Sequence, residues 1–300
     1  MWIPDQAGRA ALGELPSEVR CNLFPREGPP PAEILEAEFL VPSHATRGLV
    51  ELLPRMKALR VIQALSAGVD WLMPAAPADV VVCSARGARD GAVAEWVLAA
   101  LLALTKDLPE LRDRQRQHDW RWREPRDIAG RKVLILGYGS IGKAVEQRLA
   151  PFGVDLIRVA RRRRPGVHPA DQLTTLLPVA EVLIILLPFT AETEELLTHS
   201  MLSLLPPGAL LVNAARGRVV EQAGLLELLH AGRLRAALDV TDPEPLPRDH
   251  PLWDAPGVLI TPHLAGDSPE ASRNAFALVG EQVRRYVRGE PLANVVGQSY

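Results

Sequence analysis

The feature that most constrains the fold is a run of branched apolar residues that leads directly into a glycine-rich turn. Residues 133–136 are Val-Leu-Ile-Leu, typical of a buried strand, and Gly137, Gly139 and Gly142 follow in the spacing G-x-G-x-x-G. The next residues, 143–149, are good helix formers with an apolar face. In this strand–turn–helix context the glycines predict a site for the pyrophosphate of a dinucleotide, because helix N–H groups and the positive end of the helix dipole face the turn.

Short apolar runs alternate with helix-like segments on both sides of this turn. The part of the chain that begins at residue 131 predicts six strands, the first leading into the turn and the others at 154–160, 182–187, 208–213, 234–239 and 257–261. The N-terminal part predicts strands at 19–24, 39–41, 59–65 and 80–83 and an amphipathic helix at 48–58. A long helix is expected at 91–117 and a last helix at about 268–287.

This alternation predicts an α/β protein with two doubly wound parallel-sheet domains. The part with the glycine-rich turn is typical of a Rossmann dinucleotide-binding domain. If the last helix packs back on the N-terminal part, the boundary is crossed near residue 92 and again near residue 268. The expected domains are therefore a smaller, discontinuous one of residues 1–92 and 268–300 and one of residues 93–267.

Composition excludes several classes of protein. Of the 300 residues 47% are hydrophobic and 23% charged, and the formal net charge of −2 argues against a general nucleic-acid-binding role and a polybasic membrane anchor. No secretory signal is visible, and the longest apolar stretch, 92–105, carries Glu95 and is too short to span a bilayer. Cys21 and Cys83 lack metal-ligand spacing, so we expect no metal and reduced thiols in a cytoplasmic protein.

Three chemically informative residues follow three consecutive predicted strands. Arg216 lies just past strand 208–213, Glu244 past 234–239 and His263 past 257–261. In an open parallel sheet ligands bind outside the carboxyl ends of the strands, so we expect these side chains at one edge. Singly, each would be read as a solvated or packed residue. Together they favour a functional site.

This set suits hydride transfer to the carbonyl of a 2-oxo acid. Histidine is the side chain whose unperturbed pKa lies close to neutral, so His263 would supply the proton, and a neighbouring Glu244 carboxylate would favour the imidazolium form. The planar guanidinium of Arg216 would grip the substrate carboxylate and stabilise charge on the carbonyl oxygen.

Several motifs spread along the sequence carry a family resemblance. They are Leu-Ser-Ala-Gly-Val-Asp at 65–70, Ala-Glu-Trp at 94–96, the glycines of 137–142, Leu-Pro-Phe-Thr-Ala-Glu-Thr at 187–193, and the segments 213–217, 239–245 and 261–266. On these motifs the sequence resembles the D-isomer-specific 2-hydroxyacid dehydrogenase family, and within it most the NADPH-dependent glyoxylate/hydroxypyruvate reductases. Glu244, in place of an amide, distinguishes it from the formate-oxidising members.

The resemblance implies a Rossmann domain with a flavodoxin-like substrate domain, and it implies roles for further residues. The arginine, glutamate and histidine of the family fall on Arg216, Glu244 and His263. The N–H groups of Ala67, Gly68 and Val69 would cradle the substrate carboxylate. Cofactor contacts are implied for the glycines Gly137, Gly139 and Gly142 and for Ser140, Ile141, Pro188, Thr193, Ala214, Asp239, His263, Ala265 and Gly266.

One departure from the family pattern bears on the cofactor. NAD-preferring members end the second strand of this domain with an acidic residue that accepts from the ribose 2′-OH. Here Ala160 stands at that place and four arginines follow it at 161–164. A solvated charge run is the alternative. We expect NADP, with NAD possible, and a 2′-phosphate held by Arg161 first and Arg162 next, with Arg164 a further candidate.

The sequence therefore predicts an NADPH-linked oxidoreductase that reduces a small 2-oxo acid, such as glyoxylate or hydroxypyruvate, to the D-2-hydroxy acid. Two alternatives stay open. One is an NAD-linked enzyme for a bulkier acid or 3-phosphoglycerate, whose phosphate Arg86 or Arg89 would bind. The other is a non-catalytic dinucleotide-sensing protein. We expect a homodimer through the helix at 91–117, and we interpret Trp120 and Trp122 as packing anchors.

Overall fold

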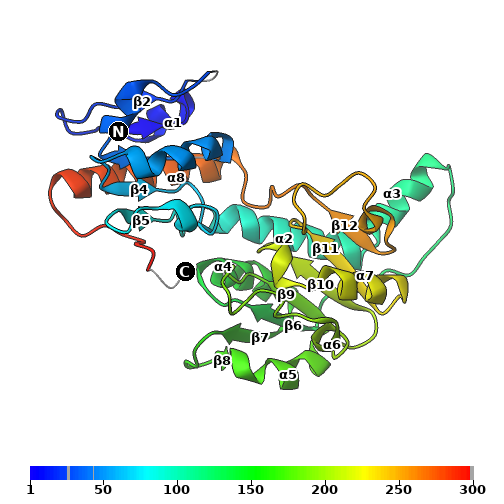
Figure 1. The fold of residues 1–300 in the computed structure, drawn as a ribbon. Coiled ribbons are helices and arrows are strands. Elements are labelled where there is room, and N and C mark those ends of the chain that lie inside the picture. Colours follow the sequence, from blue (N-terminus) through cyan, green and yellow to red (C-terminus); the bar gives the residue numbers. More distant parts are fainter. Residues whose placement is uncertain (26–27, 43, 298–300) are drawn as a thin grey trace. The chain divides into compact units, whose positions relative to one another are not determined.

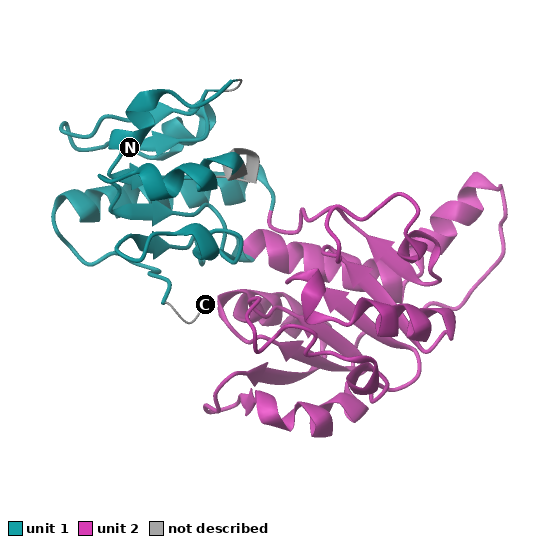
Figure 2. Ribbon diagram, viewed as in Figure 1, with its two compact units in different colours: residues 1–90, 267–300 teal, residues 91–266 magenta. Residues whose placement is uncertain are grey.

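The computed structural model describes residues 1–25, 28–42 and 44–297. The chain divides into two compact units, unit 1 with residues 1–90 and 267–300 and unit 2 with residues 91–266 (Figure 2). It therefore passes between the units twice. The functional assignment of a substrate domain to residues 1–92 and 268–300, and of a dinucleotide domain to residues 93–267, stays a prediction.

Unit 2 is built on a parallel sheet (Figure 1). Within the described residues this sheet has seven strands, in the order β12-β11-β10-β9-β6-β7-β8. The doubly wound parallel sheet predicted from the sequence is thus confirmed. The strands are β6 (Lys132–Leu136), β7 (Asp155–Ala160), β8 (His168–Pro169), β9 (Val182–Ile185), β10 (Ala209–Asn213), β11 (Leu234–Leu238) and β12 (Val258–Ile260). The sequence predicts six of them. It does not predict β8, because a strand of two residues, His and Pro, carries no apolar run.

Helices cover both faces of this sheet because its strands are apolar on both sides. Val133 and Ile135 point to the face covered by α2 (Asp90–Thr105) and α4 (Ser140–Leu149). Leu134 and Leu136 point to the opposite face, which is covered by α5 (Leu173–Leu176), α6 (His199–Leu202) and α7 (Gln222–His230). Short 3₁₀ helices, η4 (Ala150–Phe152), η5 (Ala170–Gln172), η6 (Leu177–Val179), η7 (Gly217–Val219) and η8 (Pro251–Asp254), complete the connections.

The prediction of one long helix at 91–117 is wrong in the middle of this range. The structure has two helices there, α2 and α3 (Leu108–Arg116), separated at Asp107. Asp107 adopts a left-handed conformation with φ 54°, and Pro109 follows in the first turn of α3. The carboxylate of Asp107 is buried and forms ion pairs with Arg123 at 3.0 Å and Arg235 at 2.6 Å. These two partners hold the break in place. Of the helices in the part of the chain that the structure describes, none is long and apolar enough to span a bilayer.

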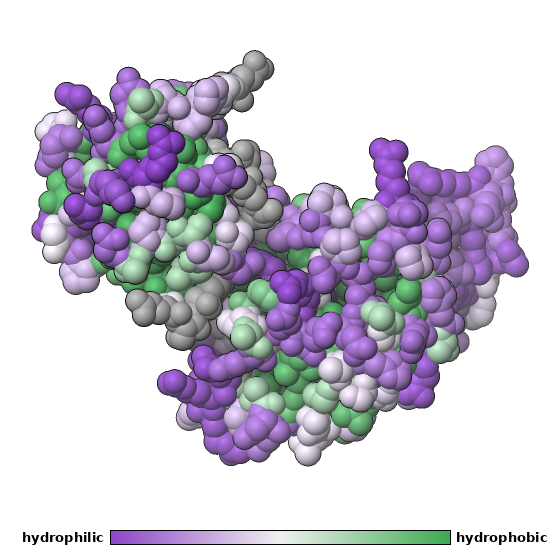
Figure 3. All heavy atoms as spheres, viewed as in Figure 1, coloured by the Kyte–Doolittle hydropathy of each residue, from purple (hydrophilic) through white to green (hydrophobic). Residues whose placement is uncertain are grey.

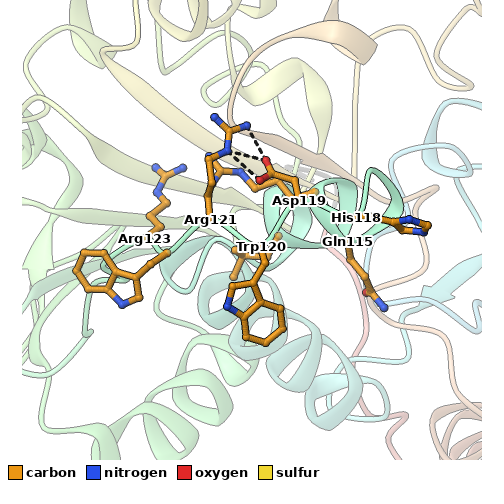
Figure 4. Close-up of a pocket in the computed structure, with 9 residues that line it drawn as sticks. Gln115, His118, Asp119, Trp120, Arg121 and Arg123 are labelled. Atoms are coloured by element: carbon orange, nitrogen blue, oxygen red, sulfur yellow. Dashed lines mark hydrogen bonds and ion pairs between the residues drawn. The ribbon is translucent and has the colours of Figure 1, made fainter.

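The interpretation of Trp120 and Trp122 as packing anchors is also wrong. Trp120 is 100% exposed and Trp122 83% exposed. They belong to the segment after α3, where Figure 4 shows Trp120 beside the Asp119–Arg121 ion pair. The side chains of this segment line a cavity of about 480 Å³. The region of α3 lies at the right of Figure 3 and is largely hydrophilic, and no residue of α3 is buried.

Unit 1 contains a smaller parallel sheet of five strands within the described residues, in the order β2-β1-β3-β4-β5. This order is flavodoxin-like, as the resemblance implies. The strands are β1 (Trp2–Ile3), β2 (Asn22–Leu23), β3 (Phe39–Leu40), β4 (Val61–Gln63) and β5 (Val81–Cys83). Helices α1 (Gln6–Ala11) and α8 (Pro269–Val287) pack on one face, and η1 (Ala32–Glu36), η2 (His44–Arg55) and η3 (Met73–Ala75) on the other.

Two expectations for unit 1 need correction. The strand β1, which lies between β2 and β3, and the helix α1 are not predicted from the sequence, because both are very short. The segment expected as an amphipathic helix at 48–58 belongs to the 3₁₀ helix η2, which contains Pro54 and ends at Arg55. A proline in a helix removes an N–H donor, and its ring clashes with the preceding turn of an α-helix. The last helix, predicted at 268–287, is confirmed as α8.

Candidate active site

The glycine-rich turn between β6 and α4 is shaped by close backbone contacts. Gly137 has φ 103°, and a Cβ atom on it would lie 2.5 Å from the carbonyl carbon and oxygen of Leu186. Gly142, in α4, packs so closely on the turn that a Cβ would lie 2.9 Å from the carbonyl oxygen of Gly137. These two positions therefore require glycine.

The start of α4 has the features needed to bind a dinucleotide. A Cβ on Gly139 would meet no atom within 4 Å, so this side of the turn is open for close approach by a ligand. Ser140 and Ile141 begin α4, and the N–H groups of a first helical turn have no partner within the helix. The turn also lies between β6 and β9, where the strand order reverses, which is where ligands bind in such sheets. The residues present thus fit a pyrophosphate.

Arg216, Glu244 and His263 lie in loops that follow three neighbouring strands, β10, β11 and β12. The structure brings the last two residues into direct contact, with Nδ1 of His263 2.9 Å from Oε1 of Glu244. The loop of Arg216 packs backbone against backbone on the loop of Glu244, because a Cβ on Gly217 would overlap the backbone of Thr241. The three loops thus form one continuous edge.

The backbone of His263 is held in an unusual conformation by Asp239. His263 has φ 52°, a region that few residues other than glycine adopt, and its N–H donates to the carbonyl oxygen of Asp239 at 2.8 Å. The carboxylate of Asp239 is buried and accepts from the Thr261 hydroxyl at 2.6 Å, from the Leu264 N–H at 2.9 Å and from the Ala265 N–H at 2.8 Å. Asp239 therefore fixes the histidine loop. Its implied contact with the cofactor stays a prediction, as do those of Ala265 and of Gly266, the last residue of unit 2.

Asn213 fixes the loop that carries Arg216, a role that is not predicted from the sequence. Its buried side chain accepts from the Ala215 N–H at 3.0 Å and donates to the Arg216 carbonyl at 3.1 Å. The guanidinium of Arg216 in turn donates to the carbonyl of Ala215 at 2.7 Å. A buried polar residue at the end of an otherwise apolar strand was the available signal. Ala214, a predicted cofactor contact, lies within this loop, and its N–H donates to Ile185 at 3.3 Å.

The loop after β9 carries two further predicted cofactor residues, and its own hydrogen bonds organise it. The hydroxyl of Thr193 donates to the Pro188 carbonyl at 2.8 Å and accepts from the Thr190 N–H at 2.8 Å. Glu192 of the same loop forms an ion pair with Arg161 at 2.8 Å, with both side chains about two-thirds exposed. The end of β7 is therefore tied to this loop.

Tyr138, within the glycine-rich turn, is the centre of a polar network. Its hydroxyl donates to Glu146 of α4, and Arg158 of β7 binds the same carboxylate through Nε at 3.0 Å. The Arg158 hydrogen bond lowers the pKa of Glu146, and the same bond raises the pKa of Arg158. Burial raises the pKa of the Tyr138 phenol. Arg164 donates to the Tyr138 carbonyl, with its guanidinium 5.7 Å from the centre of the ring.

Two of the four arginines that follow β7 border a basic cavity of about 490 Å³. Its lining includes Arg158, Arg163, Arg164 and His168, and no carboxylate side chain takes part. Among the described residues no carboxylate pairs with Arg162, Arg163 or Arg164, whereas Arg161 has Glu192. The arginine run thus concentrates positive charge next to the glycine-rich turn.

The predicted carboxylate cradle lies in unit 1, in the loop after β4. The carbonyl of Ser66 accepts from the Ala85 N–H at 2.8 Å, and the Ser66 hydroxyl donates to the carbonyl of Gly68 at 2.6 Å. The Val69 carbonyl accepts from the N–H groups of Leu72 at 2.9 Å and Met73 at 3.0 Å. The loop is thus well fixed. Binding of a carboxylate by Ala67, Gly68 and Val69 stays a prediction.

Comparison with known proteins gives consistent results. Residues 98–265 match the family model described as D-isomer specific 2-hydroxyacid dehydrogenase, NAD binding domain. The chain is 34% identical over 298 residues to a D-3-phosphoglycerate dehydrogenase of Mycobacterium bovis, covering 96% of this chain and 56% of that protein. A D-3-phosphoglycerate dehydrogenase of Methanocaldococcus jannaschii is 30% identical over 277 residues, covering 88% of this chain and 52% of that protein. The chain thus spans about half the length of these curated relatives.

Solved structures resemble the chain over nearly its whole length. A D-isomer specific 2-hydroxyacid dehydrogenase from Xanthobacter autotrophicus, in complex with NADPH and MES, has a TM-score of 0.84 and 31% identity, covering 99% of this chain and 97% of that one. An NADPH-dependent glyoxylate/hydroxypyruvate reductase from Sinorhizobium meliloti, in complex with NADP and sulfate, has a TM-score of 0.83 and 27% identity, covering 97% and 95%. With the family model matching more than half of its residues, the chain belongs to the D-isomer-specific 2-hydroxyacid dehydrogenase family.

Proposed function

We propose that this protein is an NADPH-linked reductase that converts a small 2-oxo acid, such as glyoxylate or hydroxypyruvate, to the D-2-hydroxy acid. The observation that carries the proposal is the contact of His263 Nδ1 with the Glu244 carboxylate at 2.9 Å, in loops next to that of Arg216. When a carboxylate accepts a hydrogen bond from one ring nitrogen of an imidazole, it orients the ring and leaves the other nitrogen to donate a proton.

The proposed roles follow from this geometry. A bound nicotinamide would supply the hydride that reduces C2 of the substrate. His263 donates Nδ1–H to Glu244 and carries the transferred proton on Nε2, from which it passes to the carbonyl oxygen as that oxygen becomes a hydroxyl. The carboxylate of Glu244 balances the charge of the imidazolium until the proton is given up. A positioned general acid of this kind contributes a factor of about 10² to 10⁴ in rate.

Arg216 orients the substrate in this proposal. Its guanidinium would bind the carboxylate of the oxo acid and stabilise charge on the carbonyl oxygen during reduction. The N–H groups of Ala67, Gly68 and Val69 would take the other side of the carboxylate. Asn213, which fixes the loop of Arg216, supports this orientation indirectly.

We propose NADP as the preferred cofactor. β7 ends in Ala160, so no carboxylate at this place repels a 2′-phosphate or binds a ribose 2′-OH. Arg164 is already held at the glycine-rich turn by the Tyr138 carbonyl, whereas Arg161 would exchange Glu192 for the phosphate. Arg162 carries no ion pair among the described residues. The NADPH and NADP complexes of the similar structures support the same choice.

An assay of the purified protein tests the proposal. NADPH oxidation is followed with glyoxylate, hydroxypyruvate, pyruvate and 3-phosphohydroxypyruvate, each repeated with NADH, and the product is resolved into its D and L forms. We expect turnover of the two small acids, a D product and a higher kcat/KM with NADPH. A preference for NADH, or an L product, would contradict the respective part of the proposal.

The names of several relatives favour a second candidate, an NAD-linked 3-phosphoglycerate dehydrogenase. Its substrate phosphate would need a basic residue, and Arg86 and Arg89 are the candidates in the sequence. The guanidinium of Arg89 already binds Asp267 at 2.6 Å and the Leu65 carbonyl at 2.8 Å. Turnover confined to 3-phosphohydroxypyruvate would favour this candidate. Cofactor binding without turnover of any oxo acid would instead favour a dinucleotide sensor.

We also propose that the protein is a homodimer, with α3 and the segment after it in the interface. This region exposes Leu108 and Leu111 as well as Trp120 and Trp122. A tryptophan buries about 150–250 Å² at an interface, so two per protomer supply a substantial apolar contact. A second copy of the chain is the partner because the two tryptophans on one copy would meet their equivalents across a twofold axis.

A further inference from the structure

The two places where the chain passes between its units are joined by a single arginine. The passages lie at residues 90/91 and 266/267. Arg89 lies one residue before the last residue of unit 1 at the first passage, and Asp267 immediately follows the second; their side chains form an ion pair at 2.6 Å. Both residues belong to unit 1. The Arg89 side chain is 21% exposed, so its partners shield much of it from solvent.

The same guanidinium also holds the loop that follows β4. Nε of Arg89 donates to the Leu65 carbonyl at 2.8 Å, two residues after β4 ends at Gln63. Leu65 is the first residue of the motif that contains Ala67, Gly68 and Val69. The carbonyl of Ser66 is fixed by the Ala85 N–H at 2.8 Å, four residues before Arg89. Arg89 and the residues just before it therefore anchor the start of this loop at two successive carbonyls.

Asp267 connects this anchor to the histidine loop along the sequence. It follows directly after Gly266 in the segment 261–266, where Asp239 holds the residues around His263. One planar side chain thus contacts the Leu65 carbonyl, at the start of the predicted substrate cradle, and the carboxylate of Asp267, the residue that follows the segment 261–266. Arginine suits this position because its donors have a fixed geometry, whereas the ammonium of lysine is a point charge.

We propose that Arg89 is a positioning residue for substrate binding, which couples the Leu65 carbonyl, and with it the 67–69 cradle, to Asp267 at the second passage between the units. The expected effect on KM rests on the proposed function. The expected effect on the loop itself rests only on contacts within unit 1. Arg89 acts through the loop backbone and does not itself bind the substrate carboxylate. A displacement of about 1 Å in a substrate-binding group can lower activity by about 10²-fold.

The structural arm of the test measures hydrogen exchange of the wild type, Arg89→Gln and Arg285→Gln. Arg285 is a matched control in the same unit, because it pairs with Glu281 at 3.1 Å and donates to the Pro291 carbonyl at 3.2 Å. The N–H groups of Ala85 and Leu72, which donate to Ser66 and Val69, report on the loop. We expect their exchange to accelerate several-fold in Arg89→Gln and to stay unchanged in Arg285→Gln. Equal exchange in all three proteins would overturn the proposal.

The kinetic arm measures KM for the oxo acid and the dissociation constant of NADPH. We expect Arg89→Gln to raise KM about tenfold or more while NADPH affinity changes less than twofold, since the cofactor residues lie in unit 2. Arg89→Lys should recover part of the loss and Asp267→Asn should show a smaller increase, because each keeps one of the two contacts. An equal loss of NADPH affinity would refute a positioning role. If the wild type reduces no oxo acid, the proposed function fails while the exchange arm still decides the inference.

Discussion

Nδ1 of His263 lies 2.9 Å from Oε1 of Glu244, although the two residues are 19 positions apart in the sequence. The two residues come from loops after neighbouring parallel strands, β12 and β11, and both side chains are a little over one-third exposed. A contact at this exposure is accessible to a small polar substrate. It is also worth little for stability, because solvent screens exposed ion pairs. A role in the proposed reaction therefore explains this contact better than a contribution to the stability of the fold does.

Substitutions of His263 and of Glu244 should test their proposed roles separately. His263→Ala removes the proton donor and should lower kcat by about 10² to 10⁴. Glu244→Gln keeps a hydrogen-bond acceptor but removes the negative charge beside the imidazole, so kcat should fall by a smaller factor than in His263→Ala. Steady-state rates of oxo-acid reduction check both. A His263→Ala enzyme within a few-fold of wild type would rule out the proposed proton donor.

Asp239 should prove to be important for the stability of the histidine loop. Asp239→Asn places an NH₂ group where a buried oxygen now accepts from the Ala265 or Leu264 N–H, so a donor would face a donor. We expect a loss of about 1–3 kcal/mol in the free energy of unfolding. Urea denaturation checks this, with Thr261→Val, which removes only one donor to the same carboxylate, as the milder control. An unchanged unfolding midpoint for Asp239→Asn would contradict this account.

The arginines after β7 should distinguish NADPH from NADH. Arg164→Ala and Arg161→Ala each remove a guanidinium that would bind the 2′-phosphate, and loss of one charge-assisted hydrogen bond costs about 1.5–3 kcal/mol. This corresponds to a rise of about 10- to 100-fold in the KM for NADPH. The KM for NADH, which lacks the phosphate, should stay nearly constant. Arg273→Ala, an exposed arginine paired with Glu270 in α8, serves as control. Parallel changes for both cofactors would argue against phosphate recognition.

The ion pair of Glu146 with Arg158 should make stability depend on pH in the acid range. The Arg158 hydrogen bond lowers the pKa of Glu146 in the folded protein. The ion pair therefore stabilises the folded state fully when the pH lies above the ordinary pKa of glutamate. This contribution is lost as the pH falls through the folded-state pKa. Glu146→Gln should cost about 1 kcal/mol at pH 7, and its difference from wild type should shrink below about pH 4.

Thermal unfolding of the wild type and Glu146→Gln between pH 3 and 7 measures this difference. Glu33→Gln, a glutamate in η1, is the control. A difference that is constant across the whole range would show that the charge of Glu146 contributes nothing.

The exposed tryptophans should control the oligomeric state. The double variant Trp120→Ala/Trp122→Ala removes most of the apolar surface after α3 and should convert a dimer to monomers at micromolar concentration. Light scattering coupled to gel filtration measures the mass. Trp253→Ala is the control, since Trp253 is 49% exposed and its indole nitrogen donates to Pro247. A wild-type protein that runs as a monomer at all concentrations would disprove the dimer.

The parallel α/β architecture of unit 2 could be predicted from the amino-acid sequence, because apolar runs, turn residues and helix formers are local signals. It also placed Gly137 and Gly142 correctly, since their spacing and flanking elements specify the turn. The positions of Arg216, Glu244 and His263 after consecutive strands could be predicted because parallel strands end at the same edge of a sheet.

Features that depend on partners distant in the sequence could not be predicted and are visible only in the folded chain. Asp107 breaks the helix expected at 91–117 because Arg123 and Arg235 bind its carboxylate. Arg161 and Arg164 look alike in the sequence, yet one pairs with Glu192 and the other binds the Tyr138 carbonyl. The exposure of Trp120 and the role of Asp239 in fixing the histidine loop likewise depend on which distant segments lie nearby in the fold. Burial and pairing are set by which segments the fold brings together, and no local pattern specifies that.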